Sequence, residues 1–151
     1  MKTLKIFILV FISSWLLSCS GSNSATTPSS AMSASVNGSG SINFTASFSN
    51  SNGMIIMTGS GNTYTVQLFM RLSGSGGTYT LGDPSGSYYA TVSDNFGNKY
   101  STNASSVGQA VVNSSGSSGL YNGTFYFTAT ETSPTVGGNT ISVSNGQFTN
   151  M

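Results

Sequence analysis

The chain has 151 residues, a formal net charge of +1, only 5% charged residues and no histidine. Nucleic-acid binding needs clustered Lys and Arg, which this chain lacks, so we expect no nucleic-acid partner. The absence of histidine also excludes the usual Ser-His-Asp and Cys-His mechanisms and removes the nitrogen ligands of common zinc sites.

Residues 1–18 are typical of an export signal. Lys2 and Lys5 give a positively charged start, and the twelve residues from Ile6 to Leu17 are apolar except for two serines. Twelve residues are too few for a transmembrane helix, which needs about 20, but they suit the apolar region of a signal peptide. Ser18 is a small residue of the kind that precedes a cleavage site. We therefore predict a helical signal peptide at residues 1–18.

The only cysteine, Cys19, follows this run in the order Leu16-Leu17-Ser18-Cys19. The order resembles the lipobox of bacterial lipoproteins, in which the preceding peptide is removed and the thiol receives a diacylglycerol. We therefore expect lipidation of Cys19, which makes the membrane a partner of this exported protein and the outer membrane its expected location in the cell envelope. An ordinary secretory signal with a chance cysteine, or an uncleaved anchor, is the alternative.

Residues 19–30 join this cysteine to a stretch rich in Ser and Thr that lacks apolar periodicity. Such composition is typical of a flexible tether. Fully extended, residues 20–30 would reach about 35 Å.

From residue 31 to residue 151 short runs of alternating apolar and polar residues are separated by Gly, Asn and Ser clusters. This pattern predicts strands at residues 32–36, 42–48, 54–58, 63–72, 78–81, 88–92, 100–102, 109–113, 121–130 and 141–144. No segment has a helical period of useful length. About ten short strands predict a single all-β domain, an antiparallel β-sandwich, with a closed up-and-down or lipocalin-like β-barrel as the alternative.

The clearest strand lies at residues 63–72. Tyr64, Val66, Leu68 and Met70 share one face of it, which we predict to be buried, and Phe69 lies on the opposite face. The glycine-rich residues 74–77 should close a hairpin into the next strand. Such a hairpin would also explain why residues 61–66 resemble residues 76–81.

Four motifs resemble a family of small bacterial lipoproteins that carry a domain of unknown function. They are Ser35-Val36-Asn37-Gly38, Gly77-Thr78-Tyr79-Thr80-Leu81, Gly123-Thr124-Phe125-Tyr126-Phe127-Thr128-Ala129, and Ile141-Ser142-Val143-Ser144-Asn145-Gly146-Gln147-Phe148. The resemblance covers almost all of residues 31–151 and implies an envelope location and a β fold. It implies no activity and no catalytic residue.

Three carboxylates remain after the signal, and all have the surroundings of turns or strand ends. Asp83 precedes a proline, Asp94 lies among asparagine and glycine, and Glu131 ends a long strand. Asp and Pro are ordinary turn residues, so we expect no catalytic pair, no cofactor and no enzyme activity. Asp94, Asn95 and Asn98 could offer hard oxygens to Ca²⁺, but their spacing is not that of an EF-hand and only one is charged, so hairpin capping is favoured and no metal is predicted.

The aromatic residues are the remaining candidates for function. Phe69 and Tyr126 lie on strand faces opposite the predicted core and together form a candidate exposed platform. We therefore expect a non-catalytic binding or interaction module whose partner is a glycan, a small ligand or an envelope protein. A structural or accessory envelope protein without a small-molecule site is the alternative.

Overall fold

The computed structural model describes residues 29–72, 76–114, 120–132 and 138–151. Cys19, the predicted signal peptide and residues 19–28 of the predicted tether lie outside these ranges. The strands are β1 (Ala31–Val36), β2 (Ile42–Ser51), β3 (Met54–Ser60), β4 (Tyr64–Met70), β5 (Gly77–Thr80), β6 (Tyr88–Asp94), β7 (Lys99–Ser101), β8 (Gly108–Ser114), β9 (Tyr121–Glu131) and β10 (Thr140–Thr149). The all-β fold class is confirmed. In the described part of the chain, no helix has the length and apolar character required to cross a membrane.

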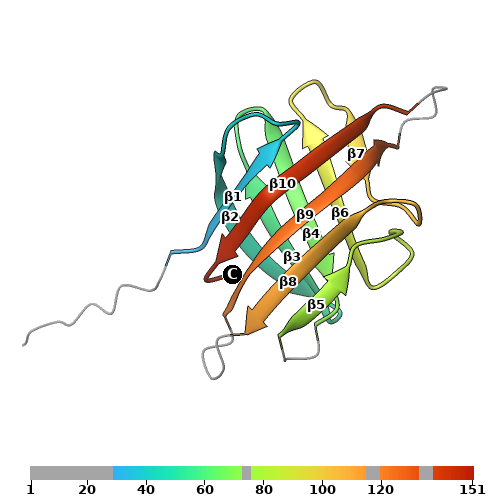
Figure 1. Cartoon of the computed structure of the whole chain (residues 1–151). Coiled ribbons are helices and arrows are strands. Elements are labelled where there is room, and N and C mark those ends of the chain that lie inside the picture. Colours follow the sequence, from blue (N-terminus) through green and yellow to red (C-terminus); the bar gives the residue numbers. More distant parts are fainter. Residues whose placement is uncertain (1–28, 73–75, 115–119, 133–137) are drawn as a thin grey trace, which may run out of the picture.

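All the strand pairs are antiparallel and join into one sheet of ten strands, in the order β10-β1-β2-β3-β4-β6-β7-β9-β8-β5. β9 also pairs with β10, so the order closes on itself and the sheet is barrel-like. β8 and β7 share the other edge of β9, at residues 121–127 and 130–131 respectively. In Figure 1, β8, β9 and β10 lie in front of β2, β3 and β4, so two facing layers are retained within the closed sheet.

The predicted inner face of β4 lies inside the closed sheet. Val66, Leu68 and Met70 are completely buried, and Tyr64 packs half-buried against the same core. The largest buried side chains from other strands include Phe127 and Phe148. Aliphatic, thioether and aromatic side chains therefore fill the centre of the closed sheet.

The β2–β3 hairpin has the turn that its sequence predicts. Asn52 and Gly53 have φ angles of 51° and 75°, and Ser51 pairs with Met54 on the other side of them. Positive φ at both central residues defines a type I′ turn, whose twist matches that of the flanking strands. This two-residue loop sets the register of β3.

The predicted hairpin between β4 and β5 is wrong. β3 and β6 occupy the two edges of β4, and β5 pairs with β8 instead. β6 offers β4 a ladder of seven register pairs, whereas β5 is only four residues long. Residues 73–75 of the expected loop lie outside the described ranges. The likeness between residues 61–66 and 76–81 therefore does not come from adjacent strands.

Candidate functional site

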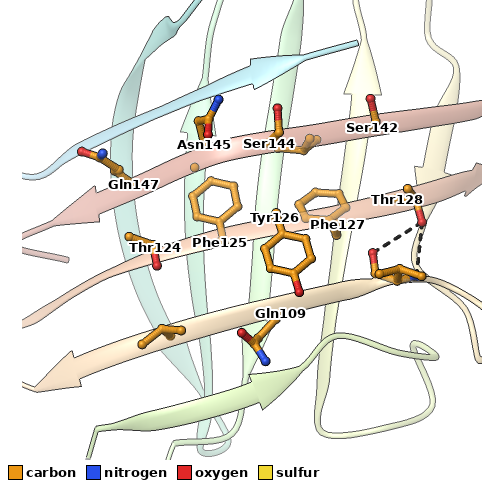
Figure 2. Close-up of a pocket in the computed structure, with 14 residues that line it drawn as sticks. Gln109, Thr124, Phe125, Tyr126, Phe127, Thr128, Ser142, Ser144, Asn145 and Gln147 are labelled. Atoms are coloured by element: carbon orange, nitrogen blue, oxygen red, sulfur yellow. Dashed lines mark hydrogen bonds between the residues drawn. The ribbon is translucent and has the colours of Figure 1, made fainter. Parts of the chain in front are cut away.

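A surface hollow of about 610 Å³ lies over the outer side of β8, β9 and β10. Phe125 and Phe127 point from β9 into the core, so the alternate residues Thr124, Tyr126 and Thr128 point outward. Figure 2 shows Tyr126 at the centre of this surface. We call this surface the Tyr126 face and define it by the outward residues Val107, Gln109, Val111, Thr124, Tyr126, Thr128, Ser142, Ser144, Asn145 and Gln147.

Strand register determines what surrounds Tyr126. Gln109 of β8 is its direct partner on one side. On the other side the ladder shifts between Val143 and Gly146, so Ser144 and Asn145 of β10 together oppose the single residue Tyr126. This is a β-bulge, a feature that redirects side chains and is common near functional sites. Figure 2 shows the Tyr126 ring on the β8 side, toward Gln109, whereas the side chains of Ser144 and Asn145 extend from β10 away from the ring.

The polar groups of the face are largely unengaged. Thr128 is the exception, because its Oγ1 accepts a hydrogen bond of 3.3 Å from the amide of Val107. Across the described ranges, no hydrogen bond within the domain engages the side-chain amides of Gln109 and Gln147 or the hydroxyl of Tyr126. Tyr126 is 47% exposed. The face thus presents one ring and several donors and acceptors to a ligand.

The hollow carries no formal charge. None of the residues that line it is Asp, Glu, Lys or Arg. The two cations of the described residues, Arg71 and Lys99, lie after β4 and in β7. A ligand on this face would therefore meet dipoles and apolar surface but no ionic partner.

The structure places Phe69 elsewhere. Its ring stacks on Tyr89 of β6, with centroids 4.3 Å apart and planes at 5°, on the outer side of β4 and β6. That pair borders a separate hollow of about 300 Å³. Phe69 and Tyr126 therefore do not form the single platform considered from the sequence. The partnership of Phe69 with Tyr89 comes from the β4–β6 register, in which the two residues are directly opposite each other.

The carboxylates are engaged in local turns. Asp83 accepts a hydrogen bond of 2.9 Å from the amide of Ser85, and hydrogen bonds from this residue hold the pKa of the Asp83 carboxyl below its ordinary value. Glu131 accepts a hydrogen bond of 3.0 Å from the side-chain amide of Asn139. None of these groups lines the Tyr126 face.

Asp94 caps the turn between β6 and β7. Its Oδ1 accepts bonds of 2.9 Å from the amides of Phe96 and Asn98, and its Oδ2 accepts one of 2.7 Å from the Asn98 side chain. Partial desolvation would raise the pKa of Asp94, but these hydrogen bonds outweigh it and the pKa lies below its ordinary value.

The three residues considered as Ca²⁺ ligands already form hydrogen bonds in or next to this turn. Both carboxylate oxygens of Asp94 already accept hydrogen bonds, and the amide of Asn95 donates to the carbonyl of Thr63 at 2.9 Å. Asn98 directs its side-chain amide at Asp94. Among the residues that the structure describes, no group of three or more His, Cys, Asp or Glu side chains could hold a metal.

One comparison with known proteins gives a match. A family model described as a domain of unknown function, DUF6252, matches residues 28–151, a segment that contains all ten strands and the four motifs noted above. No curated protein and no solved structure matches the chain. The expected all-β domain of unknown function is thereby confirmed.

Proposed function

The chain belongs to the DUF6252 family, a domain of unknown function, and we propose that it is a non-catalytic binding module held at the bacterial cell envelope by a lipid on Cys19. The Tyr126 face carries the proposal. It combines a hollow, an exposed aromatic ring and unengaged polar side chains on rigid strands. Such a combination is the usual form of a ligand site.

Binding is favoured over catalysis by where the acids lie. Asp83, Asp94 and Glu131 belong to different turns or strand ends, and each accepts a hydrogen bond from a residue close by in the chain. A carboxylate pair for hydrolysis must instead flank a substrate across a cleft. The Tyr126 face has no nucleophile with a neighbouring base.

A ligand would bind outside the closed sheet. Lipocalin-like proteins hold ligands within a barrel, which requires an interior cavity. Here the interior is occupied by buried side chains, among which Met57 and Leu68 are 0% exposed and Phe127 is 1% exposed. The outer surface is therefore the place for a ligand.

The proposed anchor would bring the domain close to the bilayer. Ser30, the last residue of the predicted tether, donates a hydrogen bond of 2.7 Å to the carbonyl of Asn150, and Ala31 pairs with Thr149 at the end of β10. The chain thus enters the domain beside a strand of the Tyr126 face. Residues 20–30 would span about 18 Å when relaxed. The Tyr126 face would then lie within reach of the polymers next to the membrane.

A structural or accessory role without a small-molecule site is the second candidate. The outer side of β2 favours it, because Asn43, Thr45 and Ser47 form an exposed polar row without an aromatic residue. A surface of this kind suits solvation more than recognition.

Hydroxyl-radical footprinting of the full chain would separate the two candidates. We expect Tyr126 to be modified more slowly in intact envelopes than in the purified protein, because a bound ligand would cover its ring. Phe96, which is 84% exposed and lies in the turn after β6, is the matched control and should change little. Equal modification of Tyr126 in both preparations would contradict the binding role and support the structural one.

A further inference from the structure

We infer the ligand class from the same surface: the Tyr126 face binds an uncharged carbohydrate chain. The inference rests on the binding role proposed above and adds the chemistry of the ligand. The evidence is the position of the ring, the kind of polar group around it, the absence of charge and the size of the hollow.

The central ring suits the apolar side of a sugar. A pyranose presents C–H groups on one side and hydroxyl groups around its rim, so it can stack on an aromatic ring while its rim remains polar. Tyr126 is 47% exposed, and its ring leans outward from β9 toward β8 and Gln109, as Figure 2 shows. Val111 and the methyl group of Thr124 lie on the same face and extend its apolar floor. A tyrosine ring supplies such contact area at a small cost in conformational entropy.

The rim of the hollow suits hydroxyl groups. Gln109 opposes Tyr126 from β8, and Asn145 opposes it from the bulge of β10. Each amide side chain has a carbonyl that accepts and an NH₂ group that donates, and a sugar hydroxyl does both. One amide can therefore bind two adjacent hydroxyls. Gln147, register partner of Thr124, places a third amide along the same strand as Asn145.

The electrostatics of the hollow favour an uncharged polymer over a charged one. Desolvated carboxylates, sulfates or phosphates need a cationic or strong hydrogen-bonding partner. The lining of the hollow contains no Lys and no Arg. It also contains no acid that would attract a cationic ligand. A neutral glycan is therefore favoured over uronic acids, teichoic acids or lipid headgroups.

The dimensions favour a short stretch of glycan over a folded protein partner. Three adjacent strands and residues 124–128 define an area of about 10 Å by 13 Å, since strands lie about 4.8 Å apart and rise about 3.3 Å per residue. That is room for about two sugar rings. A stable protein interface buries about 800 Å² on each partner, several times this area.

The test uses the purified full chain in a polyoxyethylene detergent, which carries no sugar. Saturation-transfer NMR and titration would be run with neutral β-linked oligomers of glucose, xylose, mannose and N-acetylglucosamine, and with oligogalacturonate and heparin fragments as anionic probes. We expect binding to at least one neutral series and none to the anionic probes. Tyr126→Ala should weaken binding about tenfold or more, because it removes the stacking surface.

Two control variants distinguish recognition from folding. Phe96→Ala removes a more exposed aromatic side chain outside the hollow and should leave affinity unchanged. Tyr126→Phe keeps the ring and should weaken binding by about fivefold at most, the effect of one typical hydrogen bond. All variants should keep the thermal unfolding midpoint of the parent protein. Equal losses in Tyr126→Ala and Phe96→Ala would overturn the inference.

The remaining outcomes separate this inference from the proposed function. No binding to any neutral series, with Tyr126 still protected in envelopes, overturns the carbohydrate assignment and leaves a binding module with another partner, such as a protein. No binding together with unprotected Tyr126 overturns both. Binding to the anionic probes alone overturns the assignment of a neutral ligand.

Discussion

Gly146 of β10 and Phe125 of β9 are register partners so close that no side chain fits between them. A Cβ atom on Gly146 would lie 2.5 Å from the Phe125 ring. The pair follows the bulge that sets Ser144 and Asn145 opposite Tyr126. A tightly packed contact inside the core therefore lies directly beside the bulge that faces Tyr126 on the outer side.

Gly146→Ala should destabilise the domain by about 1–3 kcal/mol, because the added methyl group forces the Phe125 ring to move within a packed core. Gly40→Ala is the control, since nothing lies within 4 Å of a Cβ at that position. It should change stability by less than about 0.5 kcal/mol. Urea denaturation of residues 29–151, whose core cluster lies within residues 32–151, would compare them. Similar stability of the two variants would show that the Phe125 ring moves aside without a measurable cost in the free energy of unfolding.

Leu68→Ala should cost about 2–5 kcal/mol, because Leu68 is completely buried at the centre of β4. Gln67→Ala, on the outer side, should cost about 1 kcal/mol, because its side chain hydrogen-bonds Thr58 at 3.2 Å and Thr91 at 3.4 Å. The same denaturation experiment measures both. A larger loss in Gln67→Ala would contradict the inward face assigned to Leu68.

Cys19→Ser should release the protein from membrane fractions or leave it unprocessed, because it removes the only thiol that could carry a diacylglycerol. Fractionation, detergent partitioning and the mass of the mature amino terminus measure this effect. Ser20→Ala is the adjacent control and should remain in the membrane fraction. Identical behaviour of the Cys19 variant and the parent protein would rule out the lipid anchor.

Asp83→Asn, Asp94→Asn and Glu131→Gln should leave ligand binding by the Tyr126 face unchanged, since none of the three carboxylates lines it. Binding to the neutral glycan probes and protection of Tyr126 in envelopes are the measurements. Loss of function in any of these variants, with the unfolding midpoint retained, would place a carboxylate in the mechanism and contradict a non-catalytic role.

Asp94 should make stability depend on pH in the acid range. Its folded-state pKa is lowered, so its stabilising effect is present above the unfolded value of about 3.9 and is lost as pH falls through the folded value. Asp94→Asn should therefore be less stable than the parent protein at pH 7, with the difference shrinking as pH falls below about 4. Denaturation at several pH values tests this, and a constant difference would contradict it.

Much of the fold follows from local sequence. Period-2 alternation along β4 and β9 placed Leu68 and Phe127 inside because side chains on a strand alternate between its faces. Asn52-Gly53 located the β2–β3 turn because that pair accepts positive φ. The inward or outward direction of Tyr126, and of Tyr88 against Tyr89, follows from the same alternation.

Only the tertiary structure decided which strands are neighbours. Alternation does not encode long-range pairing, so the sequence could not show that β6 would take the edge of β4 expected for β5 or that the first strand, β1, would join the last, β10, and close the sheet. Pairing then placed Phe69 on Tyr89 and left Tyr126 beside Gln109. The bulge at Ser144 and Asn145 has Asn145 at a φ of 51°, and the residue after it, Gly146, lies against Phe125, a contact between strands that alternation does not encode.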